Sequence, residues 1–283
     1  MKTHLLILLF CARVLSGFAE TPDQVLPYKQ TSQGELKLHI FNPPNHTSND
    51  RMRSEASDTE ATTKGRGNPA TVFFFGGGWN GGSPGQFYGQ SEHLASRGMV
   101  AICPEYRIKK THGTDPRACV MDAKSAMRWV RTHAAELGID PERILAGGGS
   151  AGGHLAAATA TIKKFNEPGE DTSVDCRPKA LVLFNPVFDN GREGYGHDRV
   201  EEYWQDFSPM HNLKKGTPPT IVFFGTQDKY VPVTTAEKYK AIMDANGDRC
   251  DLHLYQDKPH GFFNRSKDKG RDYDDTLGKM DRF

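Results

Sequence analysis

One serine of this 283-residue chain lies in a setting typical of a nucleophile. Residues 143–160 read RILAGGGSAGGHLAAATA, which is an apolar run, a glycine-rich stretch around Ser150 and an alanine-rich run. The pattern predicts a strand, a tight turn and a helix, and Gly148 and Gly152 complete a G-x-S-x-G motif. A serine on such a turn adopts a positive φ, and small residues two positions before and after it avoid a clash where strand and helix cross. The glycines therefore favour a strained nucleophile turn over a flexible linker.

Two other glycine-rich sites have similar sequences, and neither fits. A phosphate-binding loop has a Lys-Ser or Lys-Thr pair after its glycines, and none follows these. The glycines around Ser150 also match G-x-G-x-x-G, but a dinucleotide site needs an acidic residue about twenty positions further on. Glu170 and Asp171 have that spacing, yet they lie in a polar segment rather than at a strand end. We therefore expect no cofactor, and no metal, since no cysteine or histidine cluster has metal-ligand spacing.

An acid and a base follow Ser150 in the chain order that this kind of site requires. TIVFFGTQDKYVP places Asp228 just after one apolar run, and LYQDKPHGFFN places His260 just after the next. The carboxyl ends of parallel strands collect at one edge of a sheet, so both side chains are expected beside the serine. His260 would be the general base and then the general acid, while Asp228 fixes its tautomer and stabilises the imidazolium. Asp189 also follows an apolar run and is the rival to Asp228.

The other histidines are weaker candidates for the base. His154 lies one helical turn after the serine, where packing or capping is the expected role. His253 falls inside a predicted strand. His197 and His211 belong to the segment 188–217, where contact with a substrate is the most that we expect of them.

A second glycine-rich stretch, FFFGGGW over residues 73–79, also follows a buried run. Glycines at this point expose backbone N–H groups and let the backbone approach a ligand closely. Gly77 and Gly78, together with the N–H of Ala151 next to the nucleophile, are therefore expected to form an oxyanion hole. Trp79 is expected to wall the substrate pocket.

The elements that must position these residues alternate between near-continuous apolar runs and amphipathic patterns. Such alternation predicts an α/β fold, with a mostly parallel sheet and helices on both of its faces. The predicted strands are 35–44, 70–75, 99–107, 143–148, 179–187, 218–225 and 250–256, and the predicted helices are 86–98, 115–138, 151–165 and 234–247. A last helical pattern aligns Tyr273, Leu277 and Met280 on one face.

Two segments interrupt this alternation. Residues 45–69 are polar and charged without apolar periodicity, and we interpret them as an exposed loop between early strands. Residues 188–217 are rich in aromatic and charged side chains and come where a small lid would cover the end of the sheet.

The N-terminus and the overall charge indicate the compartment and exclude some partners. Residues 1–19 resemble a signal peptide cleaved after Ala19, which leaves one catalytic domain over residues 20–283, exported to the periplasm or the exterior. The formal net charge of +1 gives no support to nucleic-acid binding, and no segment is long and apolar enough to span a membrane. The oligomeric state stays open.

Four cysteines would remain after cleavage at Ala19. They permit up to two disulfides in an exported protein, and their pairing is open. Cys103 ends an apolar run and Cys119 lies in a helical pattern, so both could also be buried free thiols. The four are Cys103, Cys119, Cys176 and Cys250.

Taken together, FGGGW, PEYR, GGGSAGG, GTQDKYVP and HGFF resemble the α/β-hydrolase fold over residues 25–283. More narrowly they are similar to hormone-sensitive-lipase-like and acetyl-xylan-esterase-like carboxylesterases of the BD-FAE type. The resemblance implies hydrolysis of small or carbohydrate-borne acyl esters, such as acetyl or feruloyl groups, through an acyl-enzyme. The family usually has histidine where this chain has Phe75, and often aspartate where it has Glu105. Because the oxyanion donors are backbone groups, the chemistry is expected to survive; Arg107 is expected to pair with a carboxylate.

Other functions of the same fold stay open. QDKYVP also resembles prolyl-oligopeptidase-type catalytic domains, and the Gly-Gly-x-Trp loop is shared with aryl-formamidases. A hydrolase-fold protein that binds without catalysis usually lacks a triad member, whereas this chain has all three.

Overall fold

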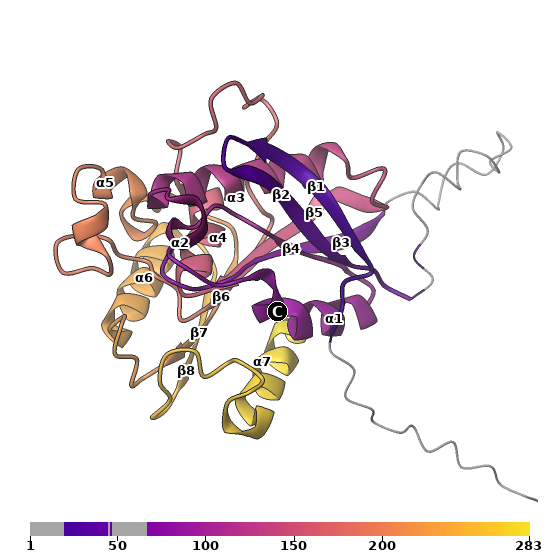
Figure 1. The fold of residues 1–283 in the computed structure, drawn as a ribbon. Helices are drawn as coiled ribbons and strands as arrows, with labels where there is room; N and C mark the ends of the chain where they lie inside the picture. Colours follow the sequence, from indigo (N-terminus) through magenta and orange to yellow (C-terminus); the bar gives the residue numbers. More distant parts are fainter. Residues whose placement is uncertain (1–19, 45, 47–66) are drawn as a thin grey trace, which may run out of the picture.

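The computed structural model describes residues 20–44, 46 and 67–283, and these build one eight-stranded sheet (Figure 1). The strands lie in the order β1-β2-β4-β3-β5-β6-β7-β8. Neighbours from β4 to β8 pair in parallel, while β1 and β2 form an antiparallel hairpin that joins β4 antiparallel. The bounds are Gln24–Thr31 (β1), Gly34–Phe41 (β2), Asn68–Phe74 (β3), Val100–Pro104 (β4), Ile139–Gly149 (β5), Leu181–Phe184 (β6), Thr220–Gly225 (β7) and Cys250–Tyr255 (β8).

Helices cover both faces of this sheet. Helices α1 (Tyr88–Ser96) and α7 (Arg271–Arg282) pack on one face, and α3 (Pro116–Thr132), α4 (Ala151–Thr161) and α6 (Val233–Asn246) pack on the other (Figure 1). Side chains of a strand alternate between the two cores, as the pleat requires. Along β7, for example, Val222 and Phe224 face α3, α4 and α6, whereas Ile221 and Phe223 face α1 and α7. The predicted α/β class, with a mostly parallel sheet covered on both sides, is confirmed.

Some boundaries differ from the sequence-based expectations, each for a local reason. The strand β1 was not predicted, because Pro27 and its polar neighbours hide the pattern; an edge strand tolerates proline, and the register with β2 shifts between Pro27 and Lys29. The helix predicted to Gly138 ends at Thr132, because the backbone of His133 leaves helical angles, with a φ of −98° and a ψ of 17°. Residues 68 and 69 of the predicted loop begin β3; residues 45 and 47–66, like the leader 1–19, lie outside the described residues.

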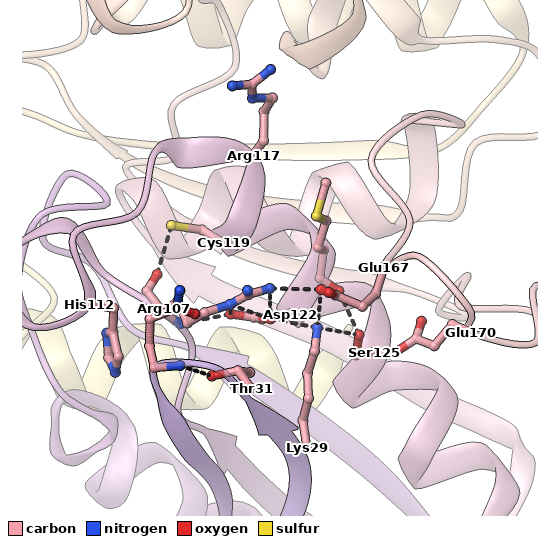
Figure 2. Close-up of polar contacts among 12 residues, drawn as sticks. Lys29, Thr31, Arg107, His112, Arg117, Cys119, Asp122, Ser125, Glu167 and Glu170 are labelled. Carbon is pink, nitrogen blue, oxygen red and sulfur yellow. Dashed lines mark hydrogen bonds and ion pairs between the residues drawn. The ribbon is translucent and has the colours of Figure 1, made fainter.

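The sheet edge near β1 is tied to the body of the protein by charged side chains. We name Lys29, Arg107, Asp122 and Glu167 the closed ion cluster (Figure 2). Arg107 lies 2.8 Å from Asp122 and 2.7 Å from Glu167, and Lys29 lies 2.6 Å from each carboxylate. The expected pairing of Arg107 with a carboxylate is confirmed, and it joins four segments that are distant in sequence.

The inserted segment 188–217 lies between β6 and β7. It contains the short helical turns His197–Arg199, Trp204–Phe207 (α5) and Met210–Asn212. Val200, Phe207 and Met210 are buried and join the core on the α4 side of the sheet. The segment is therefore anchored to the domain by its own apolar side chains.

The four cysteines of the described chain are all buried and free, so the option of disulfides is not used there. Cys103, Cys119 and Cys176 face Ser91, Arg107 and Thr159 respectively, and thus point to different neighbours. Within the residues that the structure describes, no helix has the length and apolar character needed to cross a membrane.

Candidate active site

Ser150 lies at the turn between β5 and α4 and has a strained backbone. Its φ is 55° and its ψ is −121°, a conformation that L-residues seldom adopt. A Cβ at Gly148 would lie 2.5 Å from the carbonyl oxygen of Gly152, and one at Gly152 would overlap the carbonyl oxygen of Phe74. The two glycines of the motif are thus required by backbone approach, as the sequence indicated. The turn is held by a hydrogen bond from the Ser150 N–H to the Phe184 carbonyl, 2.9 Å long.

Asp228 and His260 follow β7 and β8, as expected, and they contact each other. The Nδ1 of His260 lies 2.6 Å from Oδ2 of Asp228. The carboxylate is fully buried and accepts three further hydrogen bonds, from the Asn185 amide and from the N–H groups of Tyr230 and Val231. With Nδ1 facing a carboxylate, that nitrogen carries the proton and Nε2 is left as the basic nitrogen.

Ser150 and His260 line one cavity of about 310 Å³. The wall combines glycine backbone, amide side chains and two tyrosines, and it carries no Asp, Glu, Lys or Arg among the described residues. The lining residues are Gly76, Gly77, Gly78, Gln86, Ser150, Tyr195, Tyr230, His260, Gly261, Phe263 and Asn264.

The predicted oxyanion loop, residues 76–79, follows β3, and its three glycines line the same cavity. Gly77 and Gly78 have φ values of 129° and 63°, which favour glycine. The Gly77 carbonyl accepts hydrogen bonds from Asn80 and Gly81, whereas the N–H groups of Gly77 and Gly78 find no acceptor among the described residues. Ala151 is the first residue of α4, where N–H groups lack intrahelical acceptors. The N–H groups of Gly77, Gly78 and Ala151 are therefore without a backbone acceptor among the described residues, and Gly77 and Gly78 line the cavity.

Comparison with solved structures gives the family. Esterase 2 of Thermogutta terrifontis, in a structure described as phosphoramylated by tabun, is 41% identical with a TM-score of 0.83, and the match covers 92% of both chains. The chain belongs to the esterases of the α/β-hydrolase fold. A propionate-bound structure of that esterase is 40% identical with a TM-score of 0.82, again over 92% of each chain.

Family models and curated proteins agree with this esterase family. The BD-FAE model matches residues 59–189, and the dienelactone hydrolase family model matches residues 188–278. The probable carboxylic ester hydrolase LipM of Mycobacterium tuberculosis is 32% identical over 79% of this chain and 55% of its own length. An acetylxylan esterase of Xylanibacter ruminicola is 28% identical over 62% of this chain and 37% of its own length. The chain thus spans about half the length, or less, of these curated relatives.

In this esterase fold Trp79 does not take the place that the sequence suggested. It is not among the residues that line the described cavity, and only 1% of its surface is exposed. A φ of 57° turns its backbone so that the indole packs beneath the inserted segment, with ring centroids 5.1 Å from His154 and 5.6 Å from Phe207. Tyr195, Tyr230 and Phe263 are the aromatic residues, besides His260, that line the described cavity.

The histidines that the sequence ranked lower lie elsewhere. His154 is buried and bonded to the Phe207 carbonyl, and burial lowers its pKa to about 3. His253 is part of β8, and burial, together with the positive Lys279, lowers its pKa. Neither lines the described cavity.

Asp189, the rival acid, does not line the described cavity either. Asp189 accepts a hydrogen bond from the Gly191 N–H and lies 3.7 Å from His211, within the inserted segment. His197 is bonded to the Asn190 carbonyl. Neither histidine of this segment lines the cavity that the structure describes.

Several site residues escaped sequence reasoning, among them Asn185 and Gln86. Asn185 supports Asp228 from the end of β6, where a φ of 41° suits asparagine; an asparagine directly after an apolar strand was the available signal. Gln86 accepts from the Gly76 N–H at 2.6 Å and donates to Asn264 at 3.3 Å. It thereby connects the oxyanion loop to the loop of His260, a link between positions that no local pattern relates.

Proposed function

We propose that this chain is a serine carboxylesterase that hydrolyses short-chain acyl esters through an acyl-enzyme. The observation that carries the proposal is the 2.6 Å contact of His260 with buried Asp228 on the cavity that Ser150 also lines. The family supports ester hydrolysis as the reaction, because the relatives and structural neighbours are esterases.

The proposed reaction follows from these positions. The Ser150 oxygen attacks the ester carbonyl carbon while Nε2 of His260 takes its proton. The oxyanion accepts hydrogen bonds from the N–H groups of Gly77, Gly78 and Ala151. His260 then protonates the departing alcohol, and a water molecule activated by the same nitrogen hydrolyses the acyl-enzyme. Asp228 keeps the ring oriented and stabilises the imidazolium in both steps.

The cavity supports a small, uncharged acyl group. Its volume of about 310 Å³ is at the lower end for ligand sites, and its described lining offers no cation for an acidic acyl chain. Structures of the related Thermogutta esterase with propionate and butyrate bound agree with short acyl chains. We propose acetyl or feruloyl groups on carbohydrates as the biological substrates, with support from the BD-FAE model and the acetylxylan esterase relative.

Export of the enzyme is part of the proposal. Residues 1–19 have the charge and apolar pattern of a signal peptide with cleavage after Ala19. A polymer-borne ester would be reached outside the cell. Mass spectrometry of the secreted protein is expected to find a chain that starts at Glu20, whereas an uncleaved intracellular protein would contradict export.

The first experiment is hydrolysis of p-nitrophenyl acetate, butyrate and octanoate beside Ser150→Ala. We expect acetate or butyrate to be the best substrate, and the variant to lose about 10⁵- to 10⁶-fold in kcat while keeping its Tm. Ser173→Ala, which changes an exposed serine of a surface turn, is the matched control and should hydrolyse like the wild type.

A folded wild type without ester turnover would contradict the esterase proposal. Aryl formamides and short peptides would then be tested as substrates of the same triad. If binding of a ligand survived Ser150→Ala unchanged, the chain would be a binding protein rather than an enzyme.

A further inference from the structure

The inserted segment places a tyrosine hydroxyl directly over the oxyanion loop. Tyr195 lines the cavity together with Gly78 and Ser150. A Cβ built at Gly78 would lie only 2.8 Å from the Tyr195 hydroxyl oxygen. The glycine therefore serves a second purpose besides its φ of 63°, because it leaves the space that this hydroxyl occupies.

The Tyr195 ring is held firmly in this position. Its centroid lies 5.7 Å from that of Trp79, and the Arg199 guanidinium carbon lies over the ring, 5.1 Å from the same centroid. The Tyr195 backbone is fixed as well, with its N–H bonded to the Asp189 carbonyl and its carbonyl to the Asn190 amide. A hydroxyl on a braced aromatic ring is a preorganised donor, which loses little entropy when it binds a substrate atom.

Arg199 connects this ring to the oxyanion loop. Its guanidinium donates to the Gly78 carbonyl at 2.7 Å and lies 5.2 Å over the Trp79 ring. Gly196 makes room for it, because a Cβ there would lie 2.6 Å from a guanidinium nitrogen. One arginine thus holds both the peptide of the oxyanion loop and the tyrosine above it.

The Tyr195 hydroxyl has no hydrogen-bond partner among the residues that the structure describes. It lies in the cavity beside Gly78, whose N–H is one of the proposed oxyanion donors. A phenol hydroxyl donates one hydrogen bond, and the negative charge that develops on an oxyanion is stabilised by each donor aimed at it. The half-buried ring therefore brings an unpartnered donor to the place where negative charge would develop.

We propose that the Tyr195 hydroxyl is a side-chain donor to the oxyanion, and that Arg199 is its positioning residue. As the bond from Ser150 to the carbonyl carbon forms, the serine proton passes to His260 and the carbonyl electron pair moves to the oxygen. Tyr195 donates a hydrogen bond to that oxygen and keeps its proton. The inference rests on the proposed esterase function and adds to it a donor from outside the glycine loop.

The test is Tyr195→Phe, which removes only the hydroxyl. We expect kcat for p-nitrophenyl acetate to fall about 10- to 100-fold, with KM changed by less than about threefold, because the interaction forms in the transition state. Tyr239→Phe is the matched control, since its buried hydroxyl has no hydrogen-bond partner among the described residues and does not line the cavity. The control should keep kcat within about twofold, and both variants should keep the wild-type Tm.

A short alkyl trifluoromethyl ketone gives a second measurement. Ser150 adds to its carbonyl carbon, the serine proton passes to His260, and the ketone oxygen becomes a stable oxyanion. The inhibition constant should rise for Tyr195→Phe by the same factor by which kcat/KM falls. If Tyr195 only shaped the pocket, the inhibition constant and kcat/KM would not change by the same factor.

Arg199→Met tests the positioning role. It should lower kcat by a smaller factor, and the double variant with Tyr195→Phe should lose less than the product of the two single losses, since Arg199 acts through the tyrosine. An active wild type with unchanged kcat in Tyr195→Phe, or with a change confined to KM, overturns this inference and leaves the esterase proposal intact. A folded wild type that neither hydrolyses esters nor binds the ketone overturns both.

Discussion

Asp122 and Asp228 both have fully buried side chains, but the polar clusters around them differ in the charge of their partners. In the closed ion cluster, Asp122 faces Lys29 and Arg107, whose side chains are 8% and 10% exposed, and these cations also hold Glu167 (Figure 2). Asp228 faces neutral donors on three sides and a histidine on the fourth. In the first cluster the charged side chains pair with one another, whereas the second includes His260, which lines the cavity.

The difference lies in the partner of the carboxylate. Arginine stays charged at every ordinary pH, so the closed ion cluster can only hold its charge and bind segments together. Burial opposes ionisation of Glu167, but hydrogen bonding from Lys29 and the charge of Arg107 outweigh it and lower the pKa of that carboxyl. A histidine changes its charge near neutral pH, so the same kind of buried carboxylate beside His260 can support proton transfer. We therefore expect changes in the closed ion cluster to lower stability, and changes at Asp228 and His260 to lower kcat.

The largest expected effect comes from Asp228→Asn. The amide keeps the shape of the side chain but stabilises the wrong tautomer of His260, so kcat should fall by about 10⁴-fold, the loss typical of this change in serine hydrolases. Esterase kinetics on p-nitrophenyl acetate measure it, with Tm as the check on folding. Asp189→Asn, the matched change in the rival acid, should keep kcat within about threefold. The assignment of the acid is wrong if the two variants behave the other way round.

Asp122→Asn should have the converse effect. It leaves Lys29 and Arg107 buried with one carboxylate fewer, and breaking such a cluster typically lowers the free energy of unfolding by about 3–5 kcal/mol. Urea unfolding at pH 7 measures the loss, while kcat of the protein that remains folded should stay within about twofold. The control is Asp244→Asn, which breaks an exposed pair with Lys240 and should change stability by less than about 0.5 kcal/mol. If Asp122→Asn lowered the free energy of unfolding by less than about 1 kcal/mol, the stabilising role of the cluster would be contradicted.

The smallest expected effect concerns His154, which is fully buried, in contrast to His260, which lines the cavity. Burial lowers the pKa of His154 to about 3, below its ordinary value near 6.5. Between these values the unfolded chain binds a proton that the native chain does not, so stability is lost as the pH falls through this window. The loss attributable to His154 should reach about 2 kcal/mol between pH 6.5 and 5.

Urea unfolding from pH 7 to pH 5 for the wild type and His154→Phe measures this contribution. Whatever the variant does to stability at pH 7, its stability should depend less steeply on pH than that of the wild type. Equal slopes for the two proteins would mean that His154 is protonated in the native state and contributes nothing to the acid sensitivity.

Much of the site could be predicted because its signals are local. The strained turn at Ser150 needs small neighbours in the motif itself, and Asp228 and His260 each follow an apolar strand that can be recognised alone. Parallel pairing then brings strand ends to one edge whatever the details of packing. The residues that were missed, such as Asn185 and Gln86, act only through partners distant in the sequence.

By itself, the sequence determined the α/β class, the places of Ser150, Asp228 and His260 after successive strands, and the glycine loop, because alternation, chain order and backbone freedom are properties of short segments. The tertiary structure alone decided that Trp79 turns into the core while Tyr195 faces the cavity, and that Arg199 holds both tyrosine and loop. It also decided that Asp122 lies in one ion cluster with Lys29, Arg107 and Glu167 (Figure 2). The physical reason is that side-chain direction depends on backbone angles and on packing between segments, and neither is encoded in the spacing of residue types.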